Sequence, residues 1–124
     1  MNRGERVAAL AYLARGYRVL DANVRIGGGE LDLIVRRGRK LVFVEVKERS
    51  GRDAFGGGLA AVGPEKRRRV ERAARAWLAA HPETRGLDVV LEAAAVTGAR
   101  VTRRFWTPAD ETAPDRGGNG LIEE

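Results

Sequence analysis

Two apolar segments of the sequence have the composition of neighbouring buried strands, yet each contains charged residues. The segments are Leu31–Val35 and Leu41–Lys47, both rich in Val and Leu. Asp32 lies in the first, and Glu45 and Lys47 lie in the second. An isolated charge costs several kcal/mol to bury unless it is paired or binds a metal ion. A fold for this chain must therefore explain the three charges jointly.

The spacing of these charges indicates that they meet. Side chains alternate along a strand, so Glu45 and Lys47 share one face and the valines between them face the other way. The charged stretch Arg36–Lys40 predicts a hairpin turn, which brings Asp32 towards Glu45. Two adjacent carboxylates make a hard-oxygen site suited to Mg²⁺ or Mn²⁺, with water in the remaining positions.

Such a site suits the hydrolysis of a phosphodiester. A divalent ion held by Asp32 and Glu45 can acidify a bound water and neutralise charge that builds on the phosphate. Lys47 can orient or deprotonate the attacking water and stabilise the transition state. The alternative is a structural ion-pair cluster of the same three residues at a sheet edge, where inward charges discourage aggregation. The spacing alone leaves both interpretations open.

The composition restricts the ligands that a metal ion could find. The chain has no cysteine and one histidine, His81. Disulfides, thiolate zinc sites, a cysteine nucleophile and a histidine cage are therefore excluded. Carboxylates remain as the metal ligands.

Apolar periodicity and turn residues predict the order α-β-β-β-α-β-β. The glycine run at 27–29 matches no phosphate-loop spacing and predicts a flexible turn. The expected fold is one α/β domain with a mixed central sheet flanked by helices. The predicted elements are a helix over 3–15, strands over 17–25, 31–35 and 41–47, a helix beginning at Pro64, and strands over 87–96 and 101–106.

Charge divides the 124 residues into two parts. The formal net charge is +6, but residues 107–124 hold five carboxylates and one arginine, so residues 1–106 carry +10. We expect a domain over 1–106 and an acidic, flexible C-terminal tail over 107–124. No segment approaches the roughly 18 apolar residues of a membrane span, so we expect a cytoplasmic protein that does not enter a membrane.

The excess of positive charge favours nucleic acid as the partner. The alternative is a solvated helix face, which is the usual role of a charge run. The candidate phosphate-binding residues are Arg25, Arg49, Arg52, Lys66, Arg67, Arg68 and Arg72.

The spacing of Asp32 and Glu45-Val46-Lys47 resembles the PD-(D/E)xK signature of many restriction enzymes and Holliday junction resolvases. More closely, the chain resembles the bacterial YraN family of small endonuclease-like proteins related to archaeal Holliday junction resolvases. The resemblance spans roughly Gly4 to Phe105. Its matching pieces are GER near the N-terminus, Asn23 and Arg25, GELDLI, VFVEVKER, Lys66 and LDVV.

The resemblance implies a restriction-endonuclease-like fold and a magnesium- or manganese-dependent DNA endonuclease, with branched or junction DNA as the suggested substrate. Asp32, Glu45 and the main-chain carbonyl of Val46 would be metal ligands, and Lys47 the catalytic lysine. Glu5 matches an acid that related resolvases turn towards the metal. Its alternative role is a helix-start carboxylate favoured by the helix dipole. Resolvases cut two strands symmetrically, which implies a homodimer.

Two other functions fit the sequence less well. A DNA-binding accessory module with this fold and little catalysis would be expected to lack an acid or the lysine, whereas this chain keeps all three. An RNA-binding protein would show exposed aromatic residues on a sheet. Aromatic residues make up only 6% of the chain, so this function ranks last.

Overall fold

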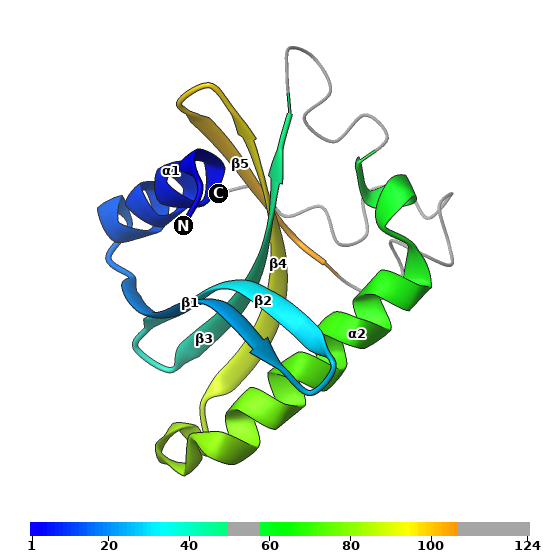
Figure 1. Cartoon of the computed structure of the whole chain (residues 1–124). Coiled ribbons are helices and arrows are strands. Elements are labelled where there is room, and N and C mark those ends of the chain that lie inside the picture. The colour runs from blue at the N-terminus through cyan, green and yellow to red at the C-terminus, as the bar shows by residue number, and fades with distance from the viewer. Residues whose placement is uncertain (50–57, 107–124) are drawn as a thin grey trace.

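A computed structural model describes residues 1–49 and 58–106 of the chain (Figure 1). The predicted element order and the α/β fold class are confirmed. The predicted tail and Arg52 lie outside the described residues, and the domain boundary stays a prediction. The elements are α1 (Arg3–Ala14), β1 (Arg18–Ile26), β2 (Gly29–Arg37), β3 (Lys40–Glu48), α2 (Gly58–Ala80), the short 3-10 helix η1 (Pro82–Thr84), β4 (Asp88–Thr97) and β5 (Arg100–Phe105).

The five strands form one mixed sheet in the order β1-β2-β3-β4-β5. Strands β1, β2 and β3 pair antiparallel, β3 and β4 pair parallel, and β4 and β5 pair antiparallel. A parallel pair needs a long crossover, which α2 provides. The turn between β2 and β3 is tighter than the predicted stretch 36–40, because β2 continues to Arg37 and β3 begins at Lys40.

The helix α2 contains a break that matches the predicted start at Pro64. Gly63, with φ 72° and ψ 166°, interrupts the helical backbone immediately before the proline. Glycine reaches this backbone region without the penalty of a side chain, and proline is tolerated in the first turn of the helix that follows. The described helices include none that is both long and apolar enough to cross a membrane.

The two helices lie on opposite faces of the sheet (Figure 1). On β3, Val42 and Val44 pack in the core beneath α1 with Tyr12. Phe43 packs in the core beneath α2 with Trp77, at a ring-centroid distance of 5.7 Å. Both faces of the central strand are therefore buried, as the apolar run along this strand predicts.

A buried carboxylate fastens α1 to the sheet. Glu92 of β4 is 2% exposed and accepts a hydrogen bond from the hydroxyl of Tyr12 at 2.7 Å. The ammonium of Lys40 lies 3.2 Å from Glu92 Oε2, and Arg103 Nε lies 3.4 Å from Oε1. Four elements thus contribute to one polar cluster, whose contacts with Glu92 offset the desolvation of the carboxylate.

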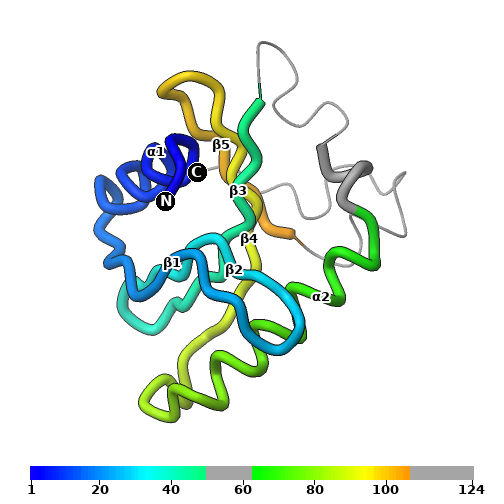
Figure 2. The backbone as a smooth tube through the Cα atoms, viewed as in Figure 1, coloured from blue at the N-terminus to red at the C-terminus, as the bar shows by residue number. Residues whose placement is uncertain are grey.

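The sheet divides at one end. Regular pairing between β2 and β3 ends at Leu33 and Val44, whereas β1 and β2 stay paired out to Ile26 and Gly29. The tip of the β1–β2 hairpin leaves β3 and reaches α2 (Figures 1 and 2). We call this divergence the fork, and Asp32 is the first β2 residue beyond the last regular pair.

The glycine turn of the hairpin packs directly on α2. A Cβ at Gly29 would lie 2.5 Å from the carbonyl oxygen of Arg69. A Cβ at Gly27, where φ is +62°, would lie 3.0 Å from the carbonyl oxygen of Arg72. A turn is predicted here and is present, but at these two positions glycine also permits close approach to the helix.

Replacing Gly29 by alanine should therefore destabilise the fold. The new methyl group meets backbone, so the hairpin or α2 must shift, and overpacking of this kind costs about 1–3 kcal/mol. Urea unfolding measures the loss. Glu30→Ala, at the exposed neighbouring position, should stay within about 0.5 kcal/mol of the parent protein. Equal unfolding midpoints for Gly29→Ala and the parent would contradict this packing role.

Candidate active site

Asp32 spans the fork through its side chain. The backbone N–H of Val46 donates a hydrogen bond to Asp32 Oδ2 at 2.9 Å. Regular pairing with β2 has ended before Val46, so the carboxylate of Asp32 accepts the hydrogen bond that a backbone carbonyl would accept in a continuous sheet. The N–H and C=O of one strand residue point to the same edge, so the carbonyl of Val46 also faces the fork. Two of the three groups that the resemblance assigns to a metal, the Asp32 carboxylate and the Val46 carbonyl, thus lie at the fork.

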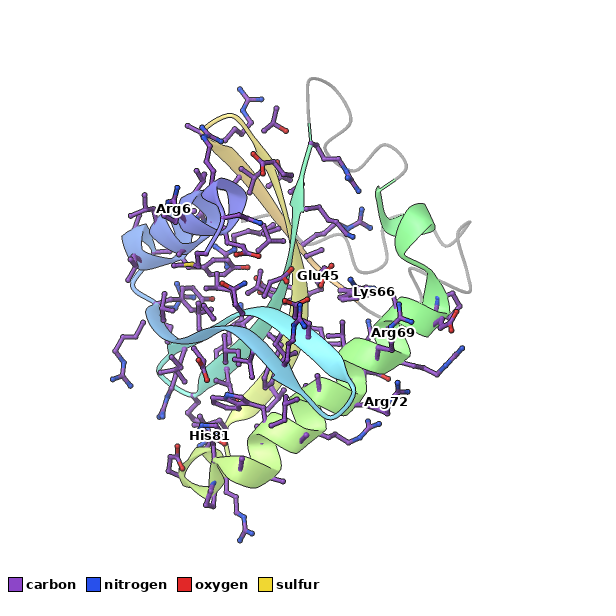
Figure 3. The ribbon with its side chains drawn as sticks, in the orientation of Figure 1. Arg6, Glu45, Lys66, Arg69, Arg72 and His81 are labelled. Carbon is purple, nitrogen blue, oxygen red and sulfur yellow. The ribbon has the colours of Figure 1, made fainter. Side chains whose placement is uncertain are left out.

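Glu45 is 5% exposed and meets two ammonium groups. Lys47 Nζ lies 3.4 Å and Lys66 Nζ 3.2 Å from the same oxygen, Glu45 Oε2. Lys47 comes from β3, whereas Lys66 reaches across from α2 (Figure 3). Lys66, which is predicted to bind phosphate, also contacts Glu45, a predicted catalytic acid.

The electrostatics of the pair favour a cation. Burial and the negative charge of Glu45 raise the pKa of Asp32 to about 7. The hydrogen bond from Val46 lowers this pKa and the charge of Glu5 raises it further, while Lys66 lowers it. Asp32 therefore binds a proton near neutral pH, and a divalent ion would relieve the same excess of negative charge.

Glu5 has a structural role at the start of α1. Its Oε1 accepts hydrogen bonds from the backbone N–H of Asn2 at 3.0 Å and from Asn23 Nδ2 at 2.9 Å. With Asn2 as the N-cap it closes a capping box, which agrees with the helix-start alternative. The negative charge of Glu5 still raises the pKa of Asp32, so its carboxylate adds to the negative charge around the acid pair.

Asn23 is a site residue that the spacing of the sequence does not indicate. It lies between the β1–β2 pairs Ala22–Leu33 and Val24–Leu31, and its φ of 53° is left-handed. Asparagine tolerates this conformation better than most residues. The strained position holds the amide against Glu5.

The donor set fits a hard divalent ion. The carboxylates of Asp32 and Glu45 and the carbonyl of Val46 offer oxygen, which Mg²⁺ and Mn²⁺ prefer. In residues 1–49 and 58–106, no group of three or more His, Cys, Asp or Glu side chains could hold a metal ion. A cation here would therefore depend on these two acids, main-chain oxygen and water.

The predicted phosphate-binding residues fall into different environments. Arg25, Arg68 and Arg72 are exposed, and Arg49 is half-buried after β3. Arg67 is 8% exposed, bonds Glu71 at 3.0 Å and donates to the carbonyl of Trp106. The guanidinium of Arg67 is thus used inside the protein, because β5 ends against this part of α2.

Comparison with known proteins assigns the chain to a family. The family model described as "Uncharacterised protein family UPF0102" matches residues 4–92. A UPF0102 protein of Methylobacterium nodulans is 44% identical over 106 residues, which cover 86% of this chain and 80% of that protein. A UPF0102 protein of Methylorubrum extorquens is 46% identical over 101 residues, covering 82% and 77%.

A relative from a third organism gives a similar match. A UPF0102 protein of Frankia casuarinae is 46% identical over 98 residues, covering 77% of this chain and 82% of its own length. The model match includes Glu5, Asp32, Glu45, Lys47 and Lys66, so the whole candidate site falls within it. The chain belongs to the UPF0102 family, which is the YraN family that its sequence resembles.

Proposed function

We propose that this protein is a metal-dependent DNA endonuclease that hydrolyses phosphodiester bonds. The observation that carries the proposal is the meeting of Asp32, Glu45 and Lys47 at the fork, with the pKa of Asp32 raised to about 7 by burial and by Glu45. The resemblance to resolvases directs the proposal to branched or junction DNA and to a homodimer.

The roles follow from the contacts of each residue. Asp32, Glu45 and the carbonyl of Val46 would hold Mg²⁺ or Mn²⁺. When bound, the ion supplies an acidified water and neutralises phosphate charge. The N–H of Val46 fixes the orientation of Asp32, so little reorganisation is needed. Lys47, whose ammonium lies 3.4 Å from Glu45 Oε2, would present that ammonium to the attacking water and the phosphate oxygens.

The electrostatics weigh against a purely structural ion-pair cluster. In such a cluster the cations would lower the pKa of each acid, because the charged form would be the stabilised one. The pKa of Asp32 instead rises even though Lys66 lies near enough to lower it. An acid whose charged form is destabilised by its surroundings is typical of a functional site.

The direct test is cleavage of junction, flap and linear duplex DNA in Mg²⁺ or Mn²⁺. Asp32→Ala and Lys47→Ala should each lower the cleavage rate by about 10²–10⁴, since each removes a group that acts on the reacting atoms. Asp88→Asn is the matched control, because Asp88 is an exposed acid whose partner Arg39 is also exposed. Binding of DNA without cleavage under every condition would replace this proposal by the accessory binding module.

Asp32→Asn should stabilise the metal-free protein at pH 8. The amide oxygen still accepts from Val46, but the buried charge is gone. The folded pKa lies above that of the unfolded chain, so the parent loses stability as pH rises from about 4 to 7. The variant should gain on the order of 2 kcal/mol at pH 8, after screening of the partly exposed group.

Thermal unfolding in a chelating buffer measures this gain, which should shrink towards pH 4. Mg²⁺ should then stabilise the parent and leave the variant unchanged. A loss of stability at pH 8 would instead support the structural ion-pair cluster.

Lys66→Met should strengthen metal binding. The ammonium of Lys66 occupies Glu45 Oε2, and its removal lets a cation approach without that repulsion. We expect Mn²⁺ to bind about fivefold more tightly at pH 8 by calorimetry, since electrostatic effects of this size are common at partly buried sites. Arg68→Met, which removes a charge from the same helix, should leave the affinity unchanged. Weaker Mn²⁺ binding by Lys66→Met would show that the lysine supports the site in another way.

A further inference from the structure

A basic pocket lies between the β1–β2 hairpin and α2. Its volume is about 630 Å³, and the glycine turn at 27–29 forms one side of it. Its charged lining residues are Arg25, Glu30, Lys66 and Arg69. Three cations against one acid leave the lining with a net positive charge, which suits an anion.

The pocket adjoins the candidate active site through Lys66. This side chain lines the pocket, and its ammonium lies 3.2 Å from Glu45 Oε2. Figure 3 shows Glu45, Lys66 and Arg69 following one another from the sheet along α2. A ligand that leaves the carboxylate pair on this side would therefore meet the pocket next.

The cations come from two elements that face each other. Lys66 and Arg69 are three residues apart on α2, so they share a face at a rise of about 4.5 Å. Arg25 projects from β1, where it pairs with Glu30 of β2. Guanidinium groups bind phosphate through paired N–H donors. Arg25 from β1 and Arg69 from α2 can therefore both donate hydrogen bonds to one tetrahedral anion in the pocket.

The glycines set the width of the pocket. Gly29 and Gly27 hold the hairpin against the backbone of α2, as their close approach to Arg69 and Arg72 shows. At Gly28 a Cβ would find no atom within 4 Å, so the turn presents bare backbone to open space. A polymer can pass such a turn more closely than it could pass side chains.

We propose that this pocket binds a backbone phosphate of the DNA strand that is cut, next to the phosphate at Asp32 and Glu45, and that Arg25 and Arg69 are the binding residues. The inference rests on the proposed nuclease function for the identity of the strand. A free phosphate ion shares the chemistry, but the continuity with the carboxylate site favours a phosphate that belongs to a strand. Arg69 is thereby added to the predicted phosphate-binding residues.

The test measures binding of a labelled 20-nucleotide duplex and single strand in metal-free buffer over a range of salt. Arg25→Gln and Arg69→Gln should each weaken binding about fivefold and lower the salt slope by about 1, because each removes one phosphate contact. Arg18→Gln is the matched control, because Arg18 is an exposed arginine at the other end of β1 from Arg25, and it should change binding less than twofold. Glu30→Gln should tighten binding, since it removes the acid from the lining.

Three results would overturn the inference. Equal losses of DNA affinity in Arg18→Gln and Arg69→Gln would show a diffuse basic surface in place of a pocket. DNA binding by Glu30→Gln that equals binding by the parent would show that the lining of the pocket does not contact the strand. Inorganic phosphate that binds the parent, is lost in Arg69→Gln and leaves DNA binding unaffected would assign the pocket to the free ion.

The outcomes for the pocket and for the nuclease are separable. If the parent binds DNA with the expected variant pattern but never cuts it, the nuclease proposal fails and the pocket stands. If the parent cuts DNA and Arg69→Gln binds and cuts as Arg18→Gln does, the pocket fails and the nuclease stands. Circular dichroism of each variant checks that the fold is retained.

Discussion

The hydrogen bond from the Val46 N–H to Asp32 is the contact on which the site depends. Where β2 leaves β3, the backbone donor of Val46 loses its strand partner, and a buried donor without an acceptor is costly. The carboxylate of Asp32 supplies that acceptor. The same contact lets the strands part, fixes the acid beside Glu45 and leaves the carbonyl of Val46 facing the opening. The division of the sheet and the candidate metal site are thus one structural feature.

The buried carboxylates of Glu92 and Glu45 lie on opposite faces of the sheet and differ in their partners. Glu92 is held by Tyr12, Lys40 and Arg103, which come from three elements and make it an anchor for α1. Glu45 instead meets two lysines at one oxygen. Of 23 basic residues only three are lysines, and all three contact one of these two acids. A compact ammonium on a flexible stem can yield its place to a cation more readily than a planar guanidinium fork.

The sequence predicted the meeting of the charges because both of its signals are local. Alternation on β3 and a short turn bring Asp32 to Glu45, and these depend on neighbouring residues alone. What it did not predict depends on long-range packing. The left-handed backbone of Asn23 and the close approach of Gly29 to α2 arise where the hairpin tip lands on the helix. Arg67 is buried while Arg68 is exposed, because Trp106 closes over only one side of α2.

The proposed function places opposite charges side by side at the fork. Residues 1–106 carry a net charge of +10, so their electric field would attract a DNA strand. At the fork itself the acids Asp32 and Glu45 repel the phosphate that must enter, and Lys66 stands between them and the basic pocket. Under the proposed function, binding would draw on the arginines and need no cation, whereas entry of the scissile phosphate would need the acid pair to be neutralised. The requirement for a divalent ion would then fall on cleavage rather than on capture of the strand, because the attractive and repulsive charges belong to different parts of one continuous surface.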